Sequence, residues 1–85
     1  MQTRVALLSI IVEDSGSIEP LNHLLHEYGM YIIGRMGIPY REKGINIISI
    51  AIDAPQDKIS TLAGKIGNLS GVNAKIAYSN VITPA

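Results

Sequence analysis

The sequence predicts a single α+β domain whose strands and helices follow the order βαββαβ. Two apolar runs, residues 5–12 and 45–52, are rich in β-branched side chains, which is typical of central strands covered on both faces. A stretch with apolar residues at helical spacing follows each run. Because the chain has only 85 residues, it has room for one domain and one hydrophobic core.

The first strand and the first helix are the most clearly marked elements. Residues 5–12 (VALLSIIV) form the strand, and the turn that follows ends at Ser17, a suitable N-cap residue. Pro20 is tolerated because it falls in the first helical turn. We expect the helix to end at Gly29, since glycine is typical of C-terminal caps. The apolar positions at helical spacing are Ile18, Leu21, Leu24, Leu25 and Tyr28.

The middle of the chain predicts a weaker second strand over residues 30–38. Gly34 and Gly37 interrupt its pattern, and a glycine inside a strand often marks a bulge or a close approach of another group. Residues 39–44 are polar and charged, so we expect them to connect this strand to the third one at residues 45–52.

The last third of the chain repeats the order of helix and strand. Residues 53–55 open a second helix, residues 68–71 end it, and residues 72–78 form the last strand. We interpret Gly64 and Gly67 as positions where the helix packs tightly against a neighbour. The apolar residues on one face of this helix are Ile59, Leu62, Ala63 and Ile66.

The two halves of the chain resemble each other. Leu8-Ser9-Ile10 parallels Ile48-Ser49-Ile50, and each of these runs ends in an acidic residue. Two βαβ halves joined in this way give a four-stranded antiparallel sheet with both helices on one face, the ferredoxin-like arrangement. The first and third strands are then central. We expect the domain to span residues 1–79, followed by a flexible C-terminal tail at residues 80–85.

Such a sheet leaves one face without helices. If the even-numbered residues of 6–12 face the helices, then Val5, Leu7 and Ile11 face outward, and either Ile45 and Ile47 or the set Ile48, Ile50 and Ile52 does so too. Each of these side chains stabilises by about 1.5–3 kcal/mol when buried, and soluble monomers seldom expose so large a patch. The apolar fraction of 47% and the mean hydropathy of +0.26 are also high for so small a protein, in agreement with such an apolar patch. We therefore predict a homo-oligomer, a dimer or a tetramer, in which sheet faces meet or edge strands pair.

Composition argues against several classes of protein. The apolar runs are much shorter than the roughly 20 residues of a membrane-spanning helix, and no signal-peptide pattern begins the chain, so we expect a cytoplasmic protein without a membrane partner. Seven basic and seven acidic residues cancel, which argues against direct nucleic-acid binding by this chain. The chain has no cysteine, which excludes disulfides and thiolate metal sites.

Catalysis is not expected. The serines and threonines have no histidine partner that the sequence reveals, and neighbouring carboxylates on a strand point in divergent directions. A small hydrolase on the same fold, such as an acylphosphatase, would need a phosphate-cradling glycine loop that is not evident. We predict that the chain is not an enzyme, and its sequence indicates no particular cofactor.

Two clusters are candidates for binding. His23 and His26 lie three residues apart on the first helix, with Glu19 and Glu27 within one turn, and could hold a metal together with an outside ligand. The alternative is an ordinary exposed helix face, because closed metal sites usually need three or four protein ligands.

The second cluster surrounds Arg35. Glycines at positions 34 and 37 permit close backbone approach, and Arg35 and Arg41 could clamp a carboxylate or a phosphate bidentately. The alternative is a glycine-relaxed edge strand followed by a solvated loop.

Several motifs together resemble a known family. They are LLHEYG at residues 24–29, IIGRMGIPYRE at residues 32–42, the strand endings IIVED and INIISIAIDAP, and LAGKIGNLSGVNAK near the end. The resemblance covers about residues 4–79 and is to the small ACT-like proteins associated with regulation of the iron-only hydrogenase system.

This resemblance implies an ACT-like domain that assembles into dimers or tetramers and binds a small anionic effector or a protein partner between subunits. Transcription regulation is among the roles it suggests. The fold is similar to the ligand-binding domain of the nickel-responsive repressor, but that repressor's histidine and cysteine site does not carry over to a chain without cysteine. The positions implied to line a ligand or partner surface are His26, Arg35, Tyr40 and Arg41. The alternative function is a metal-responsive accessory protein that uses His23 and His26.

Overall fold

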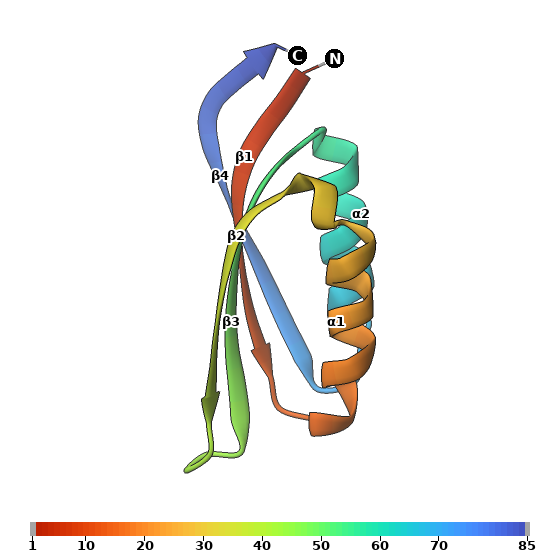
Figure 1. Cartoon of the computed structure of the whole chain (residues 1–85), viewed down its shortest axis with the longest axis vertical. Coiled ribbons are helices and arrows are strands. Elements are labelled where there is room, and N and C mark those ends of the chain that lie inside the picture. Colours follow the sequence, from red (N-terminus) through yellow and green to blue (C-terminus); the bar gives the residue numbers. More distant parts are fainter. Residues whose placement is uncertain (1, 85) are drawn as a thin grey trace.

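The computed structural model describes residues 2–84 and has the expected order of elements. Its four strands form one antiparallel sheet in the order β2-β3-β1-β4, so the two apolar runs are the central strands, as predicted. Figure 1 shows both helices on the same side of the sheet. The elements are β1 (Gln2–Val12), α1 (Ile18–Glu27), β2 (Ile32–Tyr40), β3 (Ile45–Ala54), α2 (Gln56–Gly67) and β4 (Val72–Pro84), with short 3₁₀ turns η1 (Ser15–Ser17) and η2 (Gly29–Tyr31).

The core lies between the sheet and the helices. In β1, buried even-numbered residues alternate with exposed odd-numbered ones from Ala6 to Val12, and in β3 the even-numbered residues from Ile48 to Ala54 are buried. This pattern is the period of two expected for strands whose two faces have different surroundings. It places Ile45 and Ile47 on the face without helices. The largest fully buried side chains are Leu8, Ile10, Val12, Leu21, Leu25, Ile50, Ile52, Ile59, Leu62 and Ile66.

The internal repeat of the sequence is visible in the pairing of the central strands. Ser9 lies opposite Ser49, and the pairs on either side are Leu8 with Ile50 and Ile10 with Ile48. The repeated Ser-centred motif therefore meets its own copy in antiparallel register, about a local twofold axis between the two serines.

The end of β1 is tied to the beginning of β4. The sequence suggested that the Ser17 side chain caps α1, but this expectation is wrong. Ser17 is buried, and its hydroxyl donates to the carbonyl of Ser70 instead. The carboxylate of Asp14 caps η1 by accepting from the backbone N–H of Gly16 at 2.9 Å. Gly71 has a φ of +66° and approaches Asp14 so closely that an added Cβ would lie 2.7 Å from the Asp14 Cβ. This contact requires glycine at position 71.

Three expectations about glycines and boundaries are wrong. Gly29 does not cap α1 in a left-handed conformation: the helix ends at Glu27, and Gly29 opens η2. Because η2 occupies residues 29–31, the second strand begins and ends two residues later than expected. Apart from the adjacent backbone of α2, no heavy atom of residues 2–84 lies within 4 Å of a Cβ added at Gly64 or Gly67, so these glycines do not serve tight packing within the described part of the chain.

The C-terminal residues continue the sheet instead of forming a separate tail. β4 runs to Pro84, where the sequence suggested an end at residue 78, because Gln2–Arg4 supplies it with a paired strand. The register shifts between Arg4 and Ala6, and the Arg4 guanidinium donates to the Ser79 carbonyl at 2.9 Å beside this shift. Figure 1 shows β1 and β4 extending together beyond the rest of the sheet, with both ends of the chain on the same side. Met1 and Ala85 lie outside the described residues.

Candidate functional site

A hollow of about 430 Å³ lies between α1 and β2 and brings two of the four implied site residues together. Arg35 reaches it because its position on β2 is paired with buried Ile50, which places its side chain on the helix side of the sheet. His26 reaches it from the last turn of α1. The residues that line the hollow are Asn22, Leu25, His26, Gly29, Ile32 and Arg35.

The hollow combines an apolar floor with a polar rim. Leu25 is 1% exposed and Ile32 is half-buried, whereas the side chains of Asn22, His26 and Arg35 are exposed. Nη2 of Arg35 donates to Oδ1 of Asn22 at 3.2 Å, which holds the guanidinium toward α1. A guanidinium presents several N–H groups in one plane and binds carboxylates and phosphates bidentately. This arrangement suits a small anion that also carries an apolar group.

Tyr40 and Arg41, the other two implied site residues, do not line this hollow. Tyr40 pairs with Ile45 on the face without helices and donates from its hydroxyl to Oε2 of Glu42 at 3.3 Å. Arg41 belongs to the turn between β2 and β3. Since Arg35 and Tyr40 are five strand residues apart, their Cα atoms are separated by about 16 Å. Within one chain, Arg35 and Arg41 therefore do not converge on one anion.

The two histidines of α1 also point to different surroundings. Nε2 of His23 lies 3.2 Å from Oε1 of Glu27, an (i, i+4) pair on the exposed side of the helix. His23 borders a second hollow together with Glu19, whereas His26 borders the first. Among residues 2–84, no three side chains of histidine, aspartate or glutamate come together as metal ligands would.

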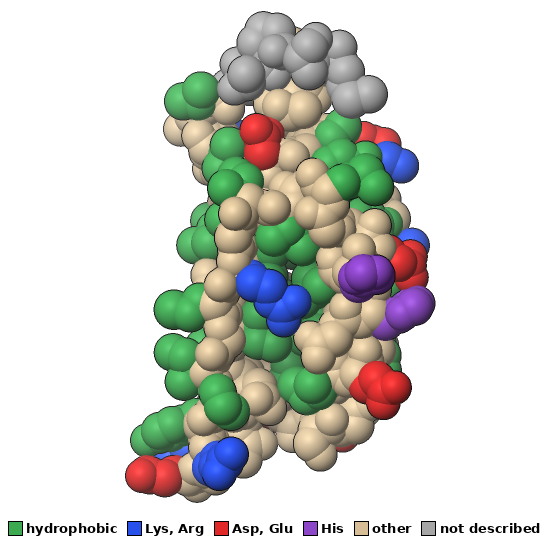
Figure 2. Space-filling model, in the orientation of Figure 1, with side chains coloured by type: hydrophobic (Ala, Val, Ile, Leu, Met, Phe, Trp, Pro, Cys, Tyr) green, Lys and Arg blue, Asp and Glu red, His purple; other side chains and the backbone are tan. Residues whose placement is uncertain are grey.

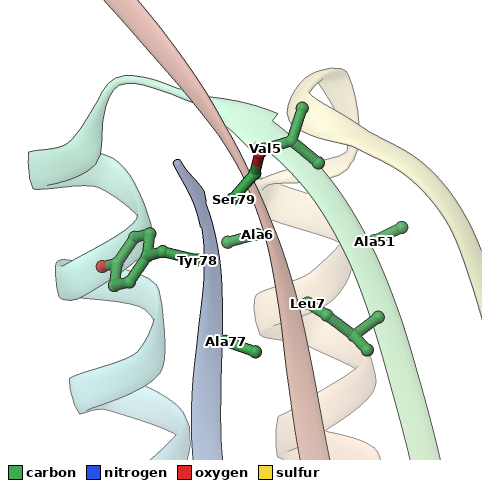
Figure 3. A pocket seen from close by; sticks show the side chains of 7 residues that line it. All are labelled: Val5, Ala6, Leu7, Ala51, Ala77, Tyr78 and Ser79. Carbon is green, nitrogen blue, oxygen red and sulfur yellow. The ribbon is translucent and has the colours of Figure 1, made fainter. Parts of the chain in front are cut away.

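Two features of the site were missed by the sequence reasoning. One is Asn22, which contacts Arg35 from α1; its position one helical turn before His26 was a usable signal, because residues at i and i+4 share a helix face. The other is a pair of hollows on the face without helices. One of them, lined by Val5, Leu7, Ala51 and Ala77 among others, is shown in Figure 3.

Comparisons with known proteins agree with this architecture. A family model described as "Iron-only hydrogenase system regulator, putative" (TM1266-like) matches residues 4–76. The chain is also similar to the solved structure of the uncharacterized protein TM1266 from Thermotoga maritima, with 34% identity and a TM-score of 0.86 over 89% of this chain and 96% of that one.

A more distant likeness shows the fold alone. A formyltetrahydrofolate deformylase from Pseudomonas putida KT2440 has 14% identity and a TM-score of 0.67, over 91% of this chain and 29% of that one. Among curated proteins, none matches the chain at a comparable level of significance. Within the described residues, no helix has the length and apolar character needed to cross a membrane.

Proposed function

We propose that the chain, which belongs to the TM1266-like family of iron-only hydrogenase system regulators, acts as a ligand-sensing module and not as an enzyme. Its ligand is a small anion, a carboxylate or a phosphate, that carries an apolar group. The ligand binds in the hollow between α1 and β2, with Arg35 as its anionic anchor and His26 beside it.

The observation that carries this proposal is the state of the Arg35 guanidinium. Among residues 2–84 it forms no ion pair, and its one hydrogen bond goes to the neutral side chain of Asn22. Arg35 lines the same hollow as the apolar side chains of Leu25 and Ile32. Charge-assisted hydrogen bonds to an anion are stronger than this neutral one, so a ligand can replace Asn22 at the guanidinium.

A homo-oligomer is part of the same proposal. The hollow opens beside β2, which is an edge strand of the sheet. An exposed edge strand presents unpaired backbone groups to a neighbour. A second copy next to β2 would cover the hollow and bring Tyr40 and Arg41 of one chain nearer to a ligand held by another.

Charge reversal at Arg35 tests the ligand site. Small carboxylates and phosphates are screened by thermal shift and native mass spectrometry, and the affinity of any that bind is measured for the native chain and for Arg35→Glu. We expect Arg35→Glu to lower affinity by roughly 10- to 100-fold or more, since a hydrogen bond to a charged group contributes about 1.5–3 kcal/mol. The circular dichroism spectrum should not change, because Arg35 is exposed.

Lys43→Glu is the matched control. It makes the same change of charge in the solvated turn between β2 and β3, and we expect it to leave affinity within about twofold, because exposed charges beyond a Debye length are screened. Equal losses in both variants would mean that only net charge matters. A screen without any binder, or a binder indifferent to Arg35→Glu, would overturn the proposed site.

A further inference from the structure

The face of the sheet without helices, which we call the open face, carries most of the exposed apolar surface. Among the described side chains, seven of the ten large exposed hydrophobic ones lie on it, as the strand register places them. Figure 2 shows hydrophobic side chains protruding along the side of the molecule that faces away from the helices. They are Val5, Leu7, Ile11, Met36, Ile38, Tyr40 and Ile47.

The open face is close to the size that a stable dimer requires. Figure 1 is viewed along the 17 Å axis of the molecule with the sheet edge-on, so the open face measures up to 43 Å by 17 Å, about 730 Å². Specific interfaces bury about 800 Å² of accessible surface per partner. Accessible surface exceeds the projected area when side chains protrude, so this one face is large enough for an interface.

Leu7 stands between two hollows on the open face. Its cross-strand neighbours are small: Ala77 on β4, Ala51 on β3 and, beyond it, Gly34 on β2. As a result Leu7 is 42% exposed, with a hollow of about 310 Å³ over Ala77 and Ala51 and another of about 240 Å³ over Ala51 and Gly34. In Figure 3, Tyr78 points toward α2, while Leu7 and Val5 extend away from it.

We infer that the open face is covered by a second copy of this chain, with Leu7 of each copy inserted into the 310 Å³ hollow of the other. A protruding side chain next to a hollow of apolar lining is complementary to itself across a twofold axis, which is the requirement for an isologous interface. The inference shares with the proposed function the expectation of a homo-oligomer, but its surface, the open face, is separate from the β2 edge next to the ligand hollow.

The polar groups of the open face are compatible with such an interface. Ser9 and Ser49 are paired across β1 and β3, two residues along the strands from the pair of Leu7 and Ala51. Neither hydroxyl has a hydrogen-bond partner among the described residues. A buried hydroxyl needs a partner, and the same serines of a second copy would supply donors and acceptors. Lys75 and Asn73 lie on β4 at the border of the apolar patch, where they can stay hydrated.

Sedimentation of Leu7→Asp provides the first test. The native chain should sediment as a dimer of 9.1 kDa subunits, or as a tetramer where the β2 edges also make contact. Leu7→Asp should raise the dissociation constant of the open-face contact roughly 30-fold or more, as expected for a central hot-spot residue. Met30→Asp is the control, because Met30 is 80% exposed but lies on η2, off the open face. It should change the dissociation constant by less than about twofold.

Disulfide trapping provides the second test and does not require a destabilising charge. The chain has no cysteine, so Leu7→Cys and Ala77→Cys each carry one thiol. Mixed and oxidised, the two variants should form a crosslinked heterodimer, since a disulfide needs Cβ atoms roughly 3.5–4.5 Å apart. Met30→Cys mixed with Ala77→Cys should not crosslink efficiently.

The outcomes separate this inference from the proposed ligand site. A dimer that survives Leu7→Asp and does not crosslink between positions 7 and 77 would place the interface elsewhere, for example at an edge strand, and would overturn the inference while ligand binding at Arg35 stands. A native chain that sediments at 9.1 kDa at high concentration would overturn it as well. Loss of ligand binding in Arg35→Glu does not bear on it.

Discussion

The two faces of the sheet carry similar side chains in opposite surroundings. Leu7 and Leu8 are neighbours in the sequence, yet Leu7 is 42% exposed and Leu8 is fully buried. On the helix side, every inward residue of β1 from Ala6 to Val12 contacts the core. On the open side, the apolar residues of the same strand are exposed. Apolar character alone therefore does not identify the core, because the placement of the helices decides which side chains are buried. The apolar residues left outside indicate an interface.

The largest expected difference in stability is between variants of the two leucines. Leu8→Ala should lower the free energy of unfolding by about 2–5 kcal/mol, because it opens a cavity in the packed core. Leu7→Ala should lower it by about 1 kcal/mol or less in dilute solution, because much of this side chain is already exposed in the single chain. Urea denaturation measures both values.

The two leucine variants should also differ in how their effect on stability depends on protein concentration. The loss in free energy of unfolding caused by Leu7→Ala should grow with protein concentration, since dimer formation stabilises the folded state by mass action. Most of the loss caused by Leu8→Ala should not depend on concentration, because Leu8 packs within the core of each chain. Equal costs for the two variants in dilute solution would contradict the assignment of the faces.

A smaller effect is expected from the glycines. Gly71→Ala should destabilise by about 1–3 kcal/mol, because position 71 has a φ of +66° and the new methyl group would meet Asp14. Gly34→Ala on the open face should change stability by less than about 0.5 kcal/mol, since apart from its chain neighbours no described residue has an atom within 4 Å of the added carbon. Thermal unfolding followed by circular dichroism compares the two, and a costly Gly34→Ala in dilute solution would count against an uncovered open face in the single chain.

The smallest expected effect compares two serines. Ser17→Ala removes the buried hydroxyl that donates to the Ser70 carbonyl, and we expect a loss of about 1 kcal/mol. Ser9→Ala on the open face removes a hydroxyl that has no hydrogen-bond partner among the described residues, and it should be nearly neutral in dilute solution. Chemical denaturation measures both, and an equal loss in the two variants would mean that Ser9 is not free on the open face.

Much of the fold could be predicted because it depends on local periodicity. The apolar, β-branched runs at residues 5–12 and 45–52 indicated strands with two apolar faces, and the spacing of Leu21, Leu25 and their neighbours indicated a helix. The end of β4 could not be predicted, because residues 79–84 have no strong strand pattern and are paired with Gln2–Arg4, far away in sequence.

The candidate site was predicted less completely. Arg35 and His26 meet in one hollow, but no spacing rule joins a residue of α1 to one of β2. Tyr40, by contrast, could have been separated from Arg35, since two strand residues at an odd spacing lie on opposite faces. Asn22 escaped notice because a neutral side chain stands out only when its partner is known.

By itself, the sequence determined the order of strands and helices, the central position of the two apolar runs and the surplus of apolar residues over what two helices can cover. These properties follow from the 2.0- and 3.6-residue periods, which act between near neighbours. Only the tertiary structure decided the register of the strands, the contact of Arg35 with α1 and the hollows beside Leu7. Each of these depends on backbone pairing and packing between distant segments, which no local pattern specifies.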